Sequence, residues 1–269
     1  MSEFQQMPSS DISTTKVALN KVYHDRMYSK LVDELYGASG FLNFGYWDDD
    51  TLSAAQASIN LMERLLEFLP HRTGKILDVA CGVGATSSHL VKYFRPRDVT
   101  GIDISDKLLD TCRRKLPDSE FIHMNAENLQ FDEHSFDYII CVEAAFHFHT
   151  REMFLREAKR TLKPGGMLIL CDALISSEFK DHRPHYCEQN AVTDLSEYEQ
   201  EYLRSGFGNV KIVDATASCW HKFFWHVVKF THQKLLDGVI TPDELDAYMF
   251  RINLLAADLK HYVLVAARA

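Results

Sequence analysis

Short apolar runs alternate with amphipathic stretches through the middle of the chain. Five of these runs have the length and composition of buried strands, and helical spacing of apolar residues fills most of the intervals between them. The runs are KILDVA (75–80), VTGIDI (99–104), EFIHMN (120–125), FDYIICVE (136–143) and MLILCDAL (167–174), and the helical intervals are 86–94, 105–115 and 151–162. This alternation predicts an α/β fold with a doubly wound, seven-stranded and mostly parallel sheet once the later strands are included.

Weaker patterns flank this central section. Apolar residues recur at helical spacing over 16–36 and again over 55–69, which predicts a helical cover at the N-terminal end. Beyond 174 we expect a helix over 196–204, a strand over 209–215, an aromatic-rich helix over 219–236, a helix that begins at the capping signal Thr241-Pro242-Asp243-Glu244, and a last strand over 261–268. A final strand that follows an inserted helical segment suggests an antiparallel edge of the sheet.

Composition narrows the possible partners. Asp and Glu outnumber Lys and Arg by 38 to 29, the net charge is −9, and the basic residues form no run, so we expect no nucleic-acid partner. The six cysteines form no CxxC pair, and neither a signal core nor a membrane-spanning apolar stretch is visible. We expect a cytoplasmic monomer or homodimer without membrane insertion.

The strongest chemical signal is the segment Asp78-Val79-Ala80-Cys81-Gly82-Val83-Gly84, which follows the first strand and opens a helix. Glycines at this turn allow the backbone to approach a nucleotide-like ligand. A dinucleotide fingerprint would need a third glycine where Ser87 stands, and a tight turn without any ligand is a further alternative. Asp103, at the end of the second strand, favours an adenosine ligand because a carboxylate accepts hydrogen bonds from both ribose hydroxyls, although Asp103 could instead cap the next helix.

Several ordered motifs over residues 75–172 resemble the core of class I S-adenosylmethionine-dependent methyltransferases. ILDVACGVG is similar to the first motif of that family, GIDIS to the second, MNAENLQFDEHSFDYI to the third-strand motif, and REAKRTLKPGGMLIL to the segment before the fifth strand. The preceding FLNFGYWDD resembles a stretch of tocopherol-type and natural-product tailoring methyltransferases.

The resemblance implies S-adenosyl-L-methionine as cofactor and assigns residues to it. Ala126 and Glu127 would flank the adenine, while Tyr46 and Trp47 would lie near the methionine end. The full set of expected cofactor-binding residues is Tyr46, Trp47, Asp78, Ala80, Gly82, Gly84, Asp103, Ile104, Ala126, Glu127 and Glu143.

His147 is the preferred general base. It lies a few residues after the fourth strand, where the resembling small-molecule enzymes carry a histidine, and a base there can accept the acceptor's proton. Asp172 is expected to orient this histidine as a second catalytic residue; a structural role is the alternative for each. His182, His185 and Cys187 could suggest a metal, but three residues without a fourth ligand favour an ordinary polar loop, so no metal is expected.

Together these features predict one methyltransferase domain over residues 1–269. It would comprise an N-terminal cover (1–72), a cofactor-binding core (73–174), and lid elements with the last strands on the substrate side (175–269). The expected reaction is methylation of an oxygen of a small, partly hydrophobic metabolite. The alternatives are C- or N-methylation of a quinone, tocopherol-like or amine acceptor, and a non-catalytic protein that binds the cofactor or a partner. The aromatic residues of 219–236 would form either core or a lid over the acceptor.

Overall fold

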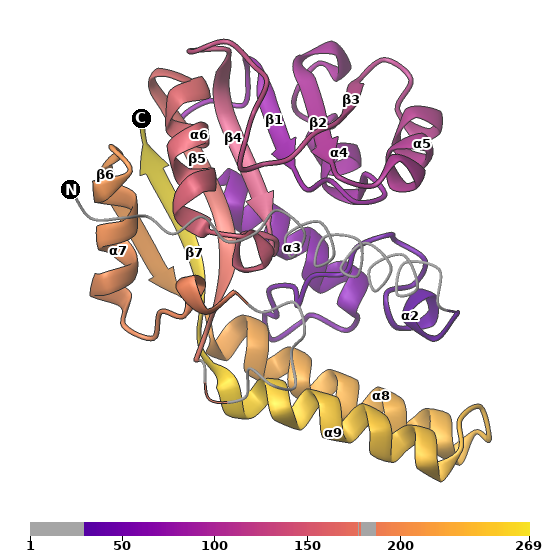
Figure 1. Ribbon diagram of the computed structural model, residues 1–269. Coiled ribbons are helices and arrows are strands. Elements are labelled where there is room, and N and C mark those ends of the chain that lie inside the picture. The colour runs from indigo at the N-terminus through magenta and orange to yellow at the C-terminus, as the bar shows by residue number, and fades with distance from the viewer. Residues whose placement is uncertain (1–29, 177, 179–186) are drawn as a thin grey trace, which may run out of the picture.

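A single seven-stranded sheet organises the computed structural model, which describes residues 30–176, 178 and 187–269 (Figure 1). The strand order is β3-β2-β1-β4-β5-β7-β6. The strands are β1 (Ile76–Val79), β2 (Val99–Asp103), β3 (Glu120–His123), β4 (Phe136–Val142), β5 (Leu162–Ile175), β6 (Gly208–Asp214) and β7 (Leu259–Arg268). The predicted α/β class and doubly wound sheet are confirmed.

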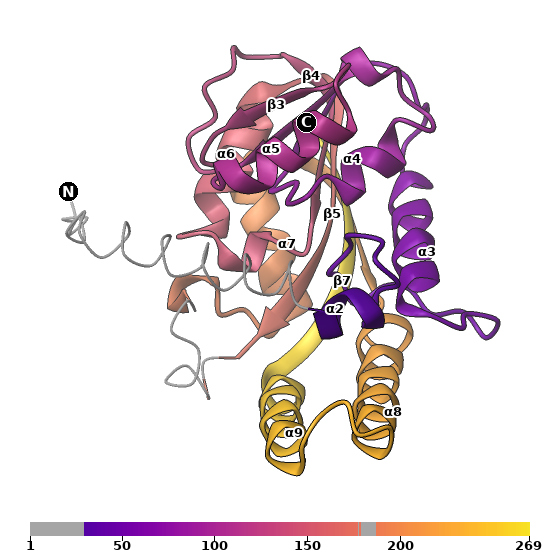
Figure 2. The ribbon, with the colours of Figure 1, turned by 90° about the vertical axis from the view of Figure 1, so that its right-hand side faces the viewer.

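Helices cover both faces of the sheet, as the alternating pattern predicts. In Figure 2, α3 and α4 lie on one side of the strands, and α6 and α7 lie on the other. The helices are α2 (Lys30–Leu35), α3 (Ala54–Leu66), α4 (Ala85–Leu90), α5 (Asp106–Lys115), α6 (Arg151–Thr161), α7 (Leu195–Arg204), α8 (Lys222–Leu236) and α9 (Pro242–Asp258), with short turns η1 (Pro96–Asp98), η2 (Ala145–His147), η4 (Glu188–Asn190) and a π-helical η5 (Ala217–His221). The N-terminal part of the helix predicted over 16–36 lies outside the described residues.

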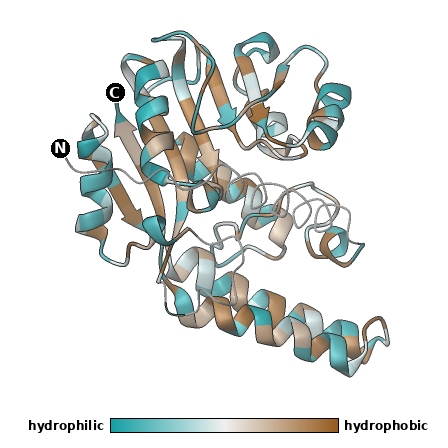
Figure 3. Ribbon diagram, viewed as in Figure 1, coloured by the Kyte–Doolittle hydropathy of each residue, from teal (hydrophilic) through white to brown (hydrophobic). Residues whose placement is uncertain are grey.

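The central strands send neighbouring side chains into two separate apolar cores. Ile76 of β1 packs into the core that includes Leu61 and Leu65 of α3, whereas the adjacent Leu77 packs into the core that includes Phe154 of α6. Both faces of the central strands are therefore apolar, which explains why these strands read as continuous hydrophobic runs. The same contrast between apolar strands and more polar helices is visible in Figure 3.

The last strand differs from its expected place. β7 is antiparallel to its neighbours, as predicted, but it pairs with β5 on one side and β6 on the other, so β6 and not β7 forms the edge. Between two neighbours, β7 has its backbone N–H and C=O groups paired on both sides, and its apolar residues Val263, Val265 and Ala267 are fully buried, as is typical of a strand inside a sheet.

Helices α8 and α9 form an antiparallel pair that projects from the body of the protein (Figures 1 and 2). The capping signal at the start of α9 is confirmed, because Thr241 and Glu244 form a reciprocal capping box. In the part of the chain that the structure describes, no helix is long and apolar enough to cross a membrane.

Candidate active site

The carboxyl ends of β1 and β4 define the position where a ligand is expected. From β1 the chain proceeds outward to β2 and β3, and from β4 it proceeds in the opposite direction to β5, so the strand order reverses between these two neighbours. Such a reversal creates the crevice in which doubly wound folds bind their ligands. Ala80 and Glu143 follow the two strands with φ of 58° and 50°. A left-handed conformation costs a non-glycine residue roughly 1–3 kcal/mol and is concentrated at functional sites.

The glycine turn after β1 packs against α5. Gly82 and Gly84 have φ of 56° and 79°, and a Cβ at Gly84 would lie 3.0 Å from Cys112 Sγ. The Cys112 thiol donates to the Gly82 carbonyl (3.2 Å), and Lys115 Nζ donates to the Val83 carbonyl (3.3 Å). The turn therefore needs glycine both for its backbone conformation and for its close packing on α5.

Asp78 lies inside the protein beneath this turn. Its side chain is almost fully buried, and the Ser87 hydroxyl donates to its Oδ2 (2.6 Å). Burial raises the pKa of Asp78 to about 7. Ser87, the residue that breaks the dinucleotide fingerprint, thus satisfies a buried carboxyl group that a glycine could not.

Asp103 lies at the end of β2 against the glycine turn. One carboxylate oxygen accepts from the Gly82 N–H (3.0 Å) and the other from the Ser105 N–H (2.9 Å). Burial raises the pKa of Asp103, although these backbone donors oppose the change. A carboxylate has about four acceptor positions, so these backbone donors leave capacity for a ribose hydroxyl. Ile104, the next residue, is half-buried.

Ala126 and Glu127 connect the segment after β3 to the start of α6. Ala126 is buried, and Glu127 Oε1 accepts from the N–H groups of His149 and Thr150. The side chain of Asn125 donates to the other oxygen, Oε2 (3.1 Å). Glu127 therefore fixes the chain just before α6, a structural task that the sequence did not reveal.

The segment 41–47 contacts the residue after β4. The Phe44 N–H and the Tyr262 hydroxyl each donate to Glu143 Oε1 at 2.6 Å. The Phe44 ring also packs against Phe223 of α8, with 4.9 Å between the ring centroids. Phe44 and Tyr262 were not anticipated, because their contacts join parts of the chain that are 99 and 119 residues from Glu143.

Tyr46 and Trp47 each have a packing partner on a helix. The Arg64 guanidinium of α3 lies 4.9 Å from the Tyr46 ring centroid. The Trp47 indole N–H donates to the Phe44 carbonyl (2.7 Å), and its ring lies 4.6 Å from that of His226 in α8. These contacts tie the segment to α3 and α8, and the expected proximity of both residues to a cofactor stays a prediction.

His147 closes the short turn η2 after β4, on the same edge of the sheet. Its side chain is half-buried, and its ring centroid lies 4.1 Å from that of Phe146. Partial exposure at this edge suits a group that exchanges protons with a bound molecule.

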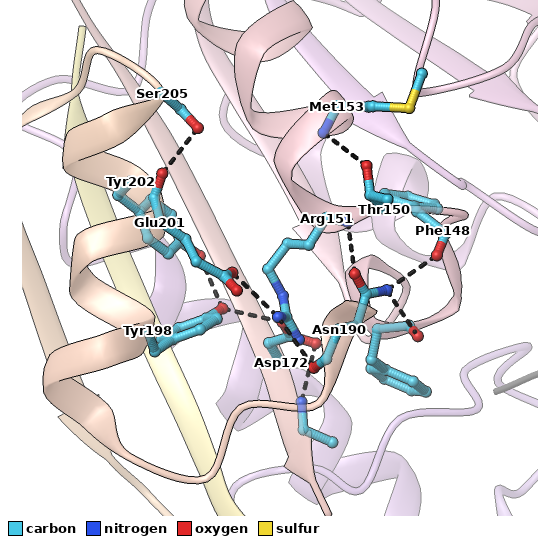
Figure 4. A network of polar contacts seen from close by, with 12 residues as sticks. Phe148, Thr150, Arg151, Met153, Asp172, Asn190, Tyr198, Glu201, Tyr202 and Ser205 are labelled. Carbon is cyan, nitrogen blue, oxygen red and sulfur yellow. Dashed lines mark hydrogen bonds and ion pairs between the residues drawn. The ribbon is translucent and has the colours of Figure 1, made fainter. Parts of the chain in front are cut away.

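Asp172 has a different partner from the one expected. Arg151 Nε donates to its Oδ2 (2.7 Å), as does the Tyr198 hydroxyl (2.9 Å), and the Ala173 N–H donates to Oδ1 (3.0 Å). Figure 4 shows this carboxylate within the polar network of α6 and α7. The side chain is fully buried and compensates the Arg151 charge, so the structure does not support the expected pairing of Asp172 with His147.

Arg151 is the centre of this network. Its side chain is 1% exposed, and it also donates to Glu201 Oε2 (3.1 Å) of α7. Burial alone would lower the pKa of Arg151, but the adjacent Asp172 carboxylate raises it above the usual range. An acidic residue inside the apolar run MLILCDAL was the available sequence signal, because a buried carboxylate needs a buried partner.

Of the three possible metal ligands named above, the structure describes only Cys187. His182 and His185 lie outside the described residues. The Cys187 thiol donates to the His149 carbonyl. Within residues 30–176, 178 and 187–269, no group of three or more metal-ligating side chains is present.

Comparisons with known proteins agree with this architecture. Residues 77–170 match the family model described as a methyltransferase domain. The chain is similar to the fatty-acid O-methyltransferase of Mycolicibacterium smegmatis, at 30% identity over 170 residues that cover 60% of this chain and 56% of that protein. It is also similar to the 27-O-demethylrifamycin SV methyltransferase of Amycolatopsis mediterranei, at 32% identity over 157 residues that cover 55% of this chain and 56% of that protein. The chain thus spans about half the length of these curated relatives.

Among solved structures, the fold is similar to that of the 4+2 cyclase SpnF, with a TM-score of 0.73 and 20% identity over 93% of this chain and 96% of that chain. At this identity the likeness describes the fold alone. The sheet, the glycine turn and the family match together define a class I S-adenosylmethionine-dependent methyltransferase domain, and this chain carries one. The predicted family is confirmed.

Proposed function

We propose that the protein transfers the methyl group of S-adenosylmethionine to an oxygen of a small, partly hydrophobic metabolite, with His147 as general base. The observation that carries this proposal is made at the carboxyl ends of the neighbouring strands β2, β1 and β4. Asp103, the glycine turn and the turn with His147 lie there, one at the end of each strand. The activities named for two relatives, a fatty-acid O-methyltransferase and a methyltransferase of an O-demethylated rifamycin, favour oxygen as the acceptor atom.

The residues at this edge fit the chemistry of the cofactor. Its ribose hydroxyls and its ammonium group are donors, and the edge offers the carboxylates of Asp103 and Glu143. The adjoining segment 41–47 adds a buried acceptor, Asn43 Oδ1, that has no hydrogen-bond partner among the described residues. Asp103 would hold the ribose, Ala126 and Glu127 the adenine side, and the segment with Tyr46 and Trp47 the methionine end. When bound, the cofactor supplies an electrophilic methyl group.

His147 would then remove the proton from the acceptor hydroxyl. A hydroxyl group is a weak nucleophile until it loses its proton, and the imidazole can take that proton while the oxygen attacks. Such general-base help is typically worth about 10²–10⁴-fold in rate. The buried cores on both sides of the sheet stabilise the turn with His147. The aromatic start of α8 would contribute the apolar side of an acceptor pocket.

The test uses tritium-labelled S-adenosylmethionine with three lipid-like probes: hexadecanoic acid, 1-hexadecanol and 4-octylphenol. We expect a labelled product with the methyl group on oxygen, located by NMR. His147→Ala should lower turnover of the hydroxyl probes by about 10²–10⁴-fold, and should affect the acid less because a carboxylate is already deprotonated. The matched control is His149→Ala on the same segment, with turnover close to the wild-type rate.

Other outcomes separate the alternatives. A methyl group on carbon or nitrogen, from a wider panel of quinones and amines, would replace the proposed O-methylation by C- or N-methylation. Cofactor binding without any product would favour a non-catalytic binding protein. A wild-type rate in His147→Ala with hydroxyl probes would remove the histidine from the mechanism.

A second test addresses the cofactor. Asp103→Ala should raise the Kd for S-adenosylhomocysteine at least about tenfold in calorimetry, because a hydrogen bond to a charged group contributes roughly 1.5–3 kcal/mol. Asp110→Ala, on the exposed face of α5, is the matched control and should leave the Kd unchanged. Equal affinities of both variants would exclude Asp103 from the binding site.

A further inference from the structure

The carbonyl groups on both sides of His147 share one hydrogen-bond partner, the side chain of Asn190. Its Nδ2 donates to the Phe148 carbonyl (2.9 Å) and is within 3.4 Å of the Phe146 carbonyl. Asn190 is 3% exposed and belongs to the short turn η4, which is more than forty residues away in sequence. One amide group therefore spans the turn that carries the proposed base (Figure 4).

The other half of the Asn190 amide is tied to α6. Its Oδ1 accepts from the Arg151 N–H (2.7 Å), and its backbone carbonyl lies 3.4 Å from Arg151 Nη1. Arg151 is in turn fixed by the carboxylates of Asp172 in β5 and Glu201 in α7. The amide thus connects the turn after β4 to a buried ion-pair network that is anchored in the sheet.

We infer that Asn190 is a positioning residue, which clamps residues 146–148 and so holds the His147 imidazole at the carboxyl edge of the sheet. This inference rests on the proposed function, because it assigns the clamp to the proposed base. The physical reason is that a turn with few hydrogen bonds of its own samples several arrangements, whereas an effective base must stay within hydrogen-bond distance of the acceptor.

The residue type matters at this position. An amide is the side chain that can donate to two carbonyl groups and accept from an N–H at the same time. Asn190→Asp keeps the shape and the acceptor for Arg151, but it removes both donors and places a carboxylate against two carbonyl oxygens. It is therefore a sharper variant than Asn190→Ala, which also leaves the Arg151 N–H without its partner.

The first experiment follows hydrogen exchange in the full-length protein without ligand. In the wild type, the His147 N–H donates to the Ala144 carbonyl and the Phe148 N–H to the Ala145 carbonyl, so both amides report on this turn. We expect exchange in the peptide 144–150 to rise at least about tenfold in Asn190→Asp, since two hydrogen bonds are lost. Tyr198→Phe is the matched control, because it removes a hydroxyl from the same network but no contact with the turn.

A spectroscopic signature separates positioning from general destabilisation. The Phe146 ring lies close enough to shift the imidazole resonances of His147, which are assigned by their absence in His147→Ala. Asn190→Asp should move these resonances toward those of an unstructured histidine, and Tyr198→Phe should leave them unchanged. Unchanged resonances and unchanged exchange in 144–150 for Asn190→Asp would overturn the inference, as would an equal rise in exchange throughout α6 and α7.

Turnover of 4-octylphenol completes the test with a double-variant cycle. We expect Asn190→Asp to lower kcat about tenfold or more with the Kd for S-adenosylhomocysteine within about twofold of the wild type, and to have no further effect in a His147→Ala background. An equal loss in both backgrounds would contradict the clamp while leaving the base intact. Full activity in His147→Ala would refute the base, whereas the exchange and NMR results would still decide whether Asn190 holds the turn.

Discussion

The carboxyl group of Asp78 illustrates how a residue in a cofactor motif can act from inside the protein. It lies under the glycine turn, accepts from Ser87, and is almost completely excluded from solvent. Asp78 would thus affect cofactor binding indirectly, by stabilising the conformation of the glycine turn. Burial also makes this group the clearest source of pH-dependent stability in the described structure.

Asp78→Asn should change how stability depends on pH. The folded pKa of Asp78 is raised from an ordinary 3.8 to about 7, so the folded state retains a proton that the unfolded state has lost between these values. Stability therefore falls as pH rises from about 4 to about 7, by as much as roughly 4 kcal/mol for this group. We expect urea unfolding across this range to show the fall in the wild type and a flatter profile in Asp78→Asn. The exposed Asp246→Asn is the control, and a wild-type profile in Asp78→Asn would refute the assignment.

The network around Arg151 joins three neighbouring pieces of secondary structure. Arg151 begins α6, Asp172 belongs to β5, and Glu201 belongs to α7, and all three side chains are withdrawn from solvent. Burial raises the pKa of Tyr198, which adds a neutral hydroxyl donor to Asp172. The network therefore fixes how the two helices pack on the sheet, and through Asn190 it also reaches the turn with His147.

Removal of one charge from this network should lower the free energy of unfolding. Asp172→Ala leaves the Arg151 guanidinium buried without its main counter-ion, which typically costs about 3–5 kcal/mol of unfolding free energy. The double variant Asp172→Ala/Arg151→Met should recover part of this loss in urea unfolding, because no uncompensated charge remains. Simple additivity of the two single effects would show that the pair is not coupled.

The aromatic residues before and within α8 differ in burial. Trp220 is 3% exposed and packs against Phe44, whereas Trp225 is 60% exposed. Trp220→Ala should therefore cost about 3–5 kcal/mol in urea unfolding, and Trp225→Ala should stay within about 0.5 kcal/mol of the wild type. A large loss in Trp225→Ala would mean that this side chain is covered in solution. The part of the segment that contacts residue 44 is core, and a lid function of α8 stays a prediction.

In the molecule as a whole, the position of β7 between β5 and β6 makes the sheet depend on this last strand. β7 hydrogen bonds to β5 and to β6, so the final strand of the chain holds the preceding one in the sheet. The N-terminal segment 41–47 meets the same region through Phe44, whose N–H donates to Glu143 Oε1, the oxygen that also accepts from the Tyr262 hydroxyl of β7. The site edge thus depends on contacts between both ends of the described chain.

Truncation tests this dependence. A chain that ends after Asp258 lacks β7, so β5 and β6 lose the strand that hydrogen bonds to both of them, and we expect loss of the cooperative unfolding transition in circular dichroism. Removal of Ala269 alone is the control, and it should shift the transition only slightly. Cooperative unfolding of the chain that ends at Asp258 would show that the sheet closes without its last strand.

Local sequence was sufficient to predict the fold class, the strands and helices of the core, and the glycine turn with Asp103, because these features follow from hydrophobic periodicity and from local backbone requirements. It could not determine that β7 lies inside the sheet, that Arg151 and not His147 pairs with Asp172, or that Asn190 and Phe44 reach the residues after β4. Each of those features is a contact between distant parts of the chain, and only the packing of two apolar cores around one sheet decides which buried polar groups meet.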